Sequence, residues 1–172
     1  MVLAATHQMG DVPVSGSPRA KHVSSLEVTV QSRLLDRNGA ASYVLIFEVG
    51  DEVMAGLVAF AKEQQLEASD FTALGAFSRA LLGFFDVEEK DYRKIPVDEQ
   101  VEVLTLVGNI TLDQGEPKVH AHTVLGCADG ATRGGHLLEG YVRPTLELVL
   151  TESPVQLRRR YDVETGLALI RL

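Results

Sequence analysis

Three of the five histidines in this chain lie in one stretch and could share a metal ion. His120 and His122 are separated by one residue in a segment that alternates between apolar and polar side chains, as a β-strand does. Residues two apart on a strand point to the same face, about 6.5–7 Å apart, so the two imidazoles can converge. His136 follows a Gly-Gly pair, and a turn between strands could bring it over the same face. From the spacing alone a plain polar sheet face is the favoured interpretation, and a three-histidine metal site is the alternative.

Zinc would suit a site of this kind. It binds neutral imidazole nitrogens at about 2.0–2.1 Å, and three protein ligands with an open fourth position are typical of catalytic rather than structural sites. Water or a substrate group can occupy that position, where the pKa of water falls to about 7. A protein with such a site would be a small-molecule binder or a zinc-dependent hydrolase or lyase. It names neither a substrate nor a reaction, and whether the chain is an enzyme stays open.

Two further side chains downstream are candidates for ligand binding. Arg143 could hold an anion through paired hydrogen bonds, or it could form an ion pair with Glu139 or Glu147. Glu139 could contact the ligand or, like Glu102, orient a histidine from behind. Cys127 shares the apolar face of its predicted strand, which indicates a small buried side chain rather than a nucleophile.

Hydrophobic patterns predict the elements that must position these residues. A hairpin is expected from strands over 26–31 and 43–49, joined by a turn at 36–39. Apolar residues at helical spacing predict one main helix over 51–65, with Asp51 as its N-cap. Pro154 is expected to begin a short helical turn, with the three arginines at 158–160 on a solvated face. Further strands are predicted over residues 71–77, 80–86, 101–107, 109–112, 118–127, 141–150 and 167–172.

The succession of strands around one helix, without an internal repeat, predicts an α+β domain with a mainly antiparallel sheet. A chain of 172 residues is expected to form one domain, here over residues 25–172. Residues 1–24 are rich in Ser, Gly, Pro and Ala without an apolar period, and we interpret them as a flexible tail. Pro144 cannot donate to a β-ladder, so its strand should carry a bulge or lie at an edge.

Composition narrows the class of partner and the compartment. The formal net charge of −8 disfavours nucleic-acid binding, because non-specific binding depends on neutralising phosphates. The single cysteine permits no internal disulfide, which favours a reducing compartment. No run approaches the roughly 18 apolar residues of a membrane helix, and the N-terminal segment lacks the pattern of a signal peptide. We therefore expect a cytoplasmic protein with no membrane partner.

A series of short motifs runs in order along the chain between residues 26 and 172. They are GAFS at 75–78, LGFFD at 82–86, PV at 96–97, VEVL at 101–104, GNI at 108–110, HAH at 120–122, GGHL at 134–137 and VRPTLE at 142–147. Together they closely resemble the plants-and-prokaryotes-conserved (PPC) domain, in particular its stand-alone bacterial members. The resemblance implies a compact fold with a strongly bent, mainly antiparallel sheet, and assembly as a homotrimer. It also implies a metal ion, zinc, at His120, His122 and His136.

In plants, proteins of this family carry an AT-hook, an Arg-Gly-Arg-type segment for the A·T minor groove, ahead of the domain. That association implies DNA binding or a regulatory role. This chain departs from the plant pattern, because its first 24 residues offer only Arg19 and Lys21, and residues 99–104 replace the plant Gly-Arg-Phe-Glu-Ile segment. The competing hypotheses are therefore a DNA-associated regulatory trimer and a zinc-dependent enzyme or small-molecule binder.

Overall fold

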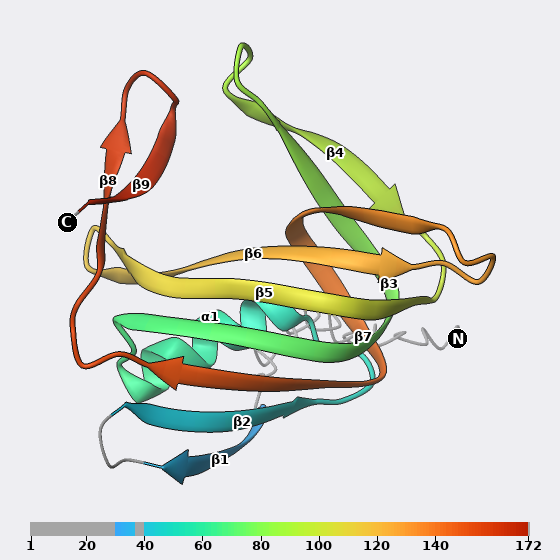
Figure 1. The fold of residues 1–172 in the computed structure, drawn as a ribbon, viewed down its shortest axis with the longest axis horizontal. Helices are drawn as coiled ribbons and strands as arrows, with labels where there is room; N and C mark the ends of the chain where they lie inside the picture. The colour runs from blue at the N-terminus through green and yellow to red at the C-terminus, as the bar shows by residue number, and fades with distance from the viewer. Residues whose placement is uncertain (1–29, 37–39, 172) are drawn as a thin grey trace, which may run out of the picture.

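The computed structural model describes residues 30–36 and 40–171, which form one nine-stranded sheet with a single helix (Figure 1). The strands are β1 (Gln31–Asp36), β2 (Ala41–Phe47), β3 (Ala68–Asp86), β4 (Asp91–Val97), β5 (Val101–Asp113), β6 (Glu116–Gly126), β7 (Thr132–Glu152), β8 (Arg158–Asp162) and β9 (Leu167–Arg171). The main path is β1-β2-β7-β3-β5-β8-β9, while β4 pairs with β3 and β6 pairs with both β5 and β7. Every strand pairing is antiparallel except a short parallel contact between β5 and β8. The predicted α+β class holds in its coarse form, with the sheet as the dominant element.

The predicted N-terminal hairpin is present, although its first strand is displaced along the chain. β1 pairs antiparallel with β2, from Gln31 opposite Ile46 to Asp36 opposite Ser42. The predicted first strand ended at Gln31, where β1 begins, and its residues 26–29 lie outside the described residues. The predicted tail over residues 1–24 and the turn residues 37–39 also lie outside them.

The helix α1 (Val53–Gln64) follows the predicted helical pattern but has a different N-cap. The carboxylate of Glu52 accepts hydrogen bonds from the backbone N–H groups of Met54 (3.1 Å) and Ala55 (2.7 Å), which are otherwise unpaired at a helix start. The prediction that Asp51 caps this helix is therefore wrong. Asp51 instead accepts a hydrogen bond from the backbone N–H of Glu48 in the preceding turn.

Two of the long strands are continuous where the sequence predicted a break. β3 runs through 19 residues and β5 through 13, although each was expected as two shorter strands. Glycines lie inside both strands, because neighbouring atoms approach too closely to admit a side chain. A Cβ atom on Gly75 would collide with the backbone of Thr145, and one on Gly108 with the ring of Phe71. Gly108, where the break in β5 was predicted, therefore marks close packing rather than a strand end, and Gly75 marks a close backbone approach inside its predicted strand.

β7 confirms the bulge predicted at Pro144. The pairing of β3 with β7 passes from Gly75 opposite Leu146 to Phe77 opposite Val142, so β7 holds two more residues than β3 over this interval. β7 is not an edge strand, because it also pairs with β2 on one part of its length and with β6 on another. The missing N–H of proline is accommodated where the ladder is already interrupted.

The C-terminal segment forms a hairpin of two strands, β8 and β9, and the helical turn predicted after Pro154 does not form. The three consecutive arginines at 158–160 therefore lie on a strand. The side chains of Val155 and Tyr161 in this segment are mostly exposed. The terminal strand predicted over 167–172 is present as β9.

The hydrophobic core lies between α1 and the face of the sheet that α1 covers (Figure 1). Its largest buried members include Phe47, Leu57, Phe71, Phe77 and Leu106. The end of β3 with β4, and the hairpin of β8 with β9, extend beyond this body on the side of β6 (Figure 1). Among the described residues no helix is long and apolar enough to cross a membrane.

Candidate metal centre

The three histidines singled out in the sequence come together where β6 meets β7. His122 on β6 lies directly opposite His136 on β7, and His120 is two residues away on the same face of β6. One ring nitrogen from each histidine lies within 4.8 Å of the others. The Nε2 atoms of His120 and His122 are 3.1 Å apart. The prediction that the three side chains gather is therefore confirmed, and His136 lies within strand β7.

Strand alternation explains why the β6 pair points away from the core. Ala121, Thr123 and Leu125 are buried on one face of β6, which leaves His120 half-buried and His122 exposed on the other. The Gly-Gly pair before His136 lets β7 approach its neighbours closely. A Cβ atom on Gly135 would lie only 2.9 Å from the carbonyl oxygen of Gly83 in β3.

The packing of the rings limits the orientation of each imidazole. His120 and His136 stack with their centroids 5.1 Å apart, and His122 meets both rings edge-on. Tyr92 on β4 packs against His136 with a centroid distance of 4.7 Å. The Nδ1 atom of His136 is buried and has no hydrogen-bond partner among the described residues. An unpaired buried nitrogen is costly, and a bound cation would satisfy it.

Burial lowers the pKa of two of the imidazoles, which favours their neutral form. It lowers the pKa of His136 to about 4, with smaller contributions from the charges of His120, His122 and Lys118. The pKa of His120 is also lowered, first by burial and then by the charges of His122, Arg159 and Lys118. A metal ion requires the neutral form of histidine, so the fold keeps these nitrogens in their ligating state.

These features fit a zinc-type ion. Two nitrogens bound at 2.0–2.1 Å in a tetrahedral site lie about 3.3 Å apart. The 3.1 Å between the Nε2 atoms of His120 and His122 is close to that separation. The set also offers only imidazole nitrogens, which zinc accepts readily, and one of the three rings carries the unpaired buried Nδ1 atom described above.

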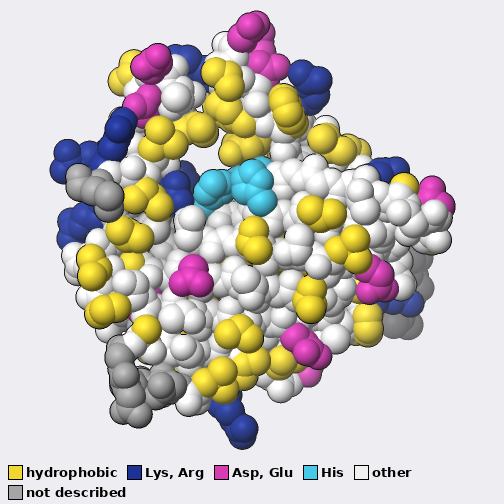
Figure 2. All heavy atoms as spheres, in the orientation of Figure 1, with side chains coloured by type: hydrophobic (Ala, Val, Ile, Leu, Met, Phe, Trp, Pro, Cys, Tyr) yellow, Lys and Arg dark blue, Asp and Glu magenta, His cyan; other side chains and the backbone are white. Residues whose placement is uncertain are grey.

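A cavity of about 170 Å³ opens beside the histidines. Figure 2 shows the histidine side chains at the base of an opening, below two arms that carry hydrophobic side chains. The cavity is lined by Tyr92, Lys118, Val119, His120, His136, Arg159, Leu167, Ala168 and Leu169. Its volume is below the roughly 300–1,000 Å³ of pockets for drug-sized ligands, so it would suit a molecule of only a few atoms.

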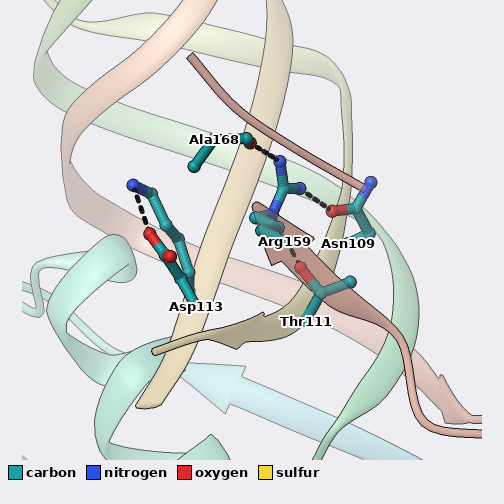
Figure 3. A network of polar contacts seen from close by, with 6 residues as sticks. Asn109, Thr111, Asp113, Arg159 and Ala168 are labelled. Atoms are coloured by element: carbon teal, nitrogen blue, oxygen red, sulfur yellow. Dashed lines mark hydrogen bonds and ion pairs between the residues drawn. The ribbon is translucent and has the colours of Figure 1, made fainter. Parts of the chain in front are cut away.

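Sequence reasoning missed Arg159 and Tyr92 as members of this site. Arg159 was assigned to a solvated helix face, yet its guanidinium turns inward and donates to Asn109, Thr111 and the carbonyl oxygen of Ala168 (Figure 3). A strand interpretation of residues 158–160 would have found it, because the middle residue of three on a strand faces away from the outer two. Tyr92 lay in a charged stretch that carried no signal of burial.

The other predicted site residues lie elsewhere. Arg143 is exposed at the bulge of β7, seven residues along the strand from His136, and it forms no ion pair within the described part of the chain. The Glu139 carboxylate lies 3.5 Å from the hydroxyl of Tyr141. Neither side chain lines the cavity beside the histidines.

Glu102 is also remote from the histidines. It lies opposite Gly126, at the far end of β6. No carboxylate in the described residues forms a hydrogen bond with a histidine, so the expected orienting role of Glu102 or Glu139 is not seen. Cys127 is a partly buried free thiol that packs against the core, on the face predicted for it.

Comparison with known proteins assigns the family. The sequence profile of the Plants and Prokaryotes Conserved (PCC) domain matches residues 36–154. This chain belongs to the PCC domain family. The match confirms the resemblance to the PPC domain, and it covers the strands that carry all three histidines. The wider domain boundaries of residues 25–172 stay a prediction.

Solved structures of similar fold come from archaea and bacteria. A plant- and prokaryote-conserved protein of Pyrococcus horikoshii is 32% identical, with a TM-score of 0.72 over 84% of this chain and 97% of that one. A metal-containing protein of Archaeoglobus fulgidus is 29% identical, with a TM-score of 0.71 over 84% of this chain and 99% of that one. A candidate DNA-binding protein of Bacteroides thetaiotaomicron is 25% identical, with a TM-score of 0.76 over 81% and 96%.

A much longer protein also contains a similar segment. The bifunctional protein GlmU of Synechococcus sp. (strain JA-3-3Ab) is 35% identical over 127 residues. The match covers 72% of this chain but only 19% of that protein. This PCC-domain chain therefore corresponds to about a fifth of the length of that relative.

Proposed function

We propose that His120, His122 and His136 hold one zinc ion, and that this PCC-domain protein uses the centre to bind a small molecule in the adjoining cavity. The observation that carries the proposal is the gathering of three imidazole nitrogens within 4.8 Å of one another. The neutral state of the buried imidazoles and the unpaired Nδ1 atom of His136 support it. So does the fold shared with a protein of Archaeoglobus fulgidus that is described as metal-containing.

The chain's own residues define what the centre would do. Held by the three histidines, zinc would supply Lewis-acid polarisation of an oxygen atom on the small molecule. Tyr92 packs against the His136 ring, which helps to fix the orientation of that imidazole. Arg159 and Lys118 place positive charge along the cavity wall. Hydrolase or lyase activity is the catalytic form of this proposal, and it would use the same residues.

Metal analysis of the purified protein tests the zinc proposal. Inductively coupled plasma mass spectrometry on the dialysed wild type should find close to one zinc per chain. The His120→Ala and His122→Ala variants should lose most of it, because two imidazoles bind zinc far more weakly than three. His22→Ala serves as the matched control and should keep the wild-type content. Less than about 0.1 metal ion per wild-type chain after growth in zinc-supplemented medium would contradict the proposal.

DNA association is the second candidate. It is supported by two solved structures of similar fold, from Bacteroides thetaiotaomicron and Ralstonia eutropha JMP134, that are described as candidate DNA-binding proteins. The net charge of −8 opposes it, because phosphate contacts supply most non-specific affinity. A DNA-binding protein should be retained on a duplex at 50 mM salt and released by about 200 mM. We expect no retention at either concentration.

Self-association as a homotrimer is part of the same proposal. The outer face of the sheet carries exposed apolar side chains, including Leu74 (63% exposed), Val107 (46%) and Val149 (49%). Val149 and Val107 both lie opposite Thr72, so they share one row across three strands. Exposed large apolar side chains gathered on one face of a sheet are typical of an interface between subunits. Native mass spectrometry should give about 56 kDa, three times the 18.7 kDa chain, and a monomer mass would contradict it.

A further inference from the structure

Arg159 is a half-buried cation whose described partners are all neutral. Its Nε donates to the hydroxyl of Thr111 (2.7 Å), its Nη2 to the side-chain oxygen of Asn109 (2.7 Å) and its Nη1 to the carbonyl oxygen of Ala168 (2.8 Å). Within residues 30–36 and 40–171 it forms no ion pair. A guanidinium removed from water is normally paired with an anion, because burial of an unpaired charge is costly.

The negative charge of the Asp113 carboxylate acts on Arg159, but this carboxylate forms its ion pair with another residue. Its Oδ2 accepts from the Nζ of Lys118 at 3.2 Å. In Figure 3 the Asp113 carboxylate lies apart from the Arg159 guanidinium, which points toward Ala168 and Asn109. The positive charge of Arg159 is therefore compensated only from a distance.

The guanidinium keeps unused hydrogen-bond donors. Arginine has five N–H groups. Three of them are donated to Asn109, Thr111 and Ala168, which leaves two, one on each terminal nitrogen. A pair of donors on the two terminal nitrogens of one planar group matches the two oxygens of a carboxylate.

Asn109 connects this guanidinium to the histidine centre. It lies directly opposite His120 in the pairing of β5 with β6, so the two side chains share one face. The cavity beside the histidines is bounded by Arg159, Lys118 and the imidazoles of His120 and His136 on one part of its wall. Val119, Leu167 and Leu169 form an apolar part of the same wall. Both cationic groups and a hydrocarbon surface therefore face about 170 Å³ of space.

We propose that this cavity is the binding subsite for a short organic carboxylate, with the carboxylate held by Arg159 and the carbon chain against Val119, Leu167 and Leu169. The inference rests on the proposed function, because it assigns the chemical class of the small molecule that the same centre takes. The apolar wall favours a carboxylate on a carbon chain over an inorganic anion. A molecule of that size would extend from Arg159 toward the three imidazoles.

Calorimetric titration with succinate tests the assignment. The wild type should bind succinate and should not bind the uncharged analogue succinamide. Arg159→Met should weaken succinate binding at least about tenfold, because it removes charge-assisted hydrogen bonds. Arg160→Met removes the same charge from the next residue, which is exposed, and should change the affinity less than about twofold. Arg159→Lys keeps the charge without the paired donors and should give an intermediate loss.

Three results would overturn the subsite. They are no succinate binding by the wild type, equal binding by Arg159→Met and wild type, and binding of inorganic phosphate in place of succinate. If Arg159 only anchors the β8–β9 hairpin, Arg159→Met will melt at a lower temperature while succinate affinity stays unchanged. Should that variant fail to fold, amide chemical shifts of the wild type decide. Succinate should move the signals of His120, Arg159 and Ala168 but not those of α1, and the absence of that pattern overturns the subsite.

Zinc content measured on the same samples separates this inference from the metal proposal. Stoichiometric zinc without succinate binding would remove the carboxylate subsite and leave the metal centre in place. Succinate binding that depends on Arg159 in a protein without zinc would keep the subsite and remove the metal. We expect chelator-treated wild type to retain weaker succinate binding that still depends on Arg159, because the guanidinium acts independently of the ion.

Discussion

Gly135→Ala should disturb both the stability of the fold and the metal centre, because the added methyl group has no space. A Cβ atom there would lie 2.9 Å from the carbonyl oxygen of Gly83. Carbon and oxygen atoms in contact normally stay beyond about 3.4 Å apart, so the backbones of β3 and β7 would have to separate by several tenths of an ångström. Overpacking against backbone costs about 1–3 kcal/mol.

The strain lies next to His136, one of the three proposed zinc-binding residues. His136 follows Gly135 directly, and Gly83 lies opposite His136 in the pairing of β3 with β7. Movement of β7 away from β3 should therefore displace the His136 ring from the nitrogens of His120 and His122. We expect the zinc affinity to fall together with the stability.

Thermal denaturation and chelator competition measure the two effects. For a chain of this size, 1–3 kcal/mol corresponds to a fall of roughly 2–12 °C in melting temperature. Gly126→Ala is the matched control on β6, since its Cβ would meet only the exposed side chain of Leu104 at 3.2 Å, and that side chain can move. A Gly135→Ala protein with wild-type stability and wild-type zinc affinity would refute the packing argument.

Three other perturbations give measurable outcomes. In chelator-treated protein, stability should fall as the pH drops from 6.5 toward 4, because the pKa of His136 is lowered to about 4 and the unfolded state binds the proton first. Urea midpoints across that range should fall less for His136→Gln than for the wild type. Equal slopes for the two proteins would contradict the assignment. Glu52→Ala should lower the free energy of unfolding by about 1–2 kcal/mol, since it removes the helix cap and the acceptor for the N–H of Gly140. Asp51→Ala should lower it less. Denaturation midpoints in the reverse order would restore Asp51 as the cap. Val107→Asp should convert the proposed trimer to monomers in native mass spectrometry, whereas Val163→Asp, on the β8–β9 turn, should leave its mass unchanged.

Local sequence patterns were sufficient to predict which way each side chain points on β6, the strand that carries His120 and His122. Alternation along β6 assigns Ala121, Thr123 and Leu125 to the core and His120 and His122 to the other face, as the structure has them. The position of His136 depends instead on the register of β6 with β7, which no local pattern encodes. The sequence could suggest its return to the site but not the strand that brings it there.

The remaining differences between the predicted and the observed elements arise where a local sequence signal was ambiguous. Glycine inside a strand resembles a break, yet Gly108 lies in β5 because the backbone of His120 and the ring of Phe71 leave no space for a side chain. Pro154 resembles a helix start, but the backbone of the following residues pairs with β9 and β5 instead. That error hid Arg159, whose inward direction follows only from the strand.

Anomalous diffraction at the zinc absorption edge, from crystals grown without added metal, tests the three-histidine centre most directly. We predict one strong anomalous peak per chain, within bonding distance of a ring nitrogen of each of His120, His122 and His136. Well-ordered rings with no peak between them, or a peak held by other residues, would contradict the assignment of these histidines as a metal site.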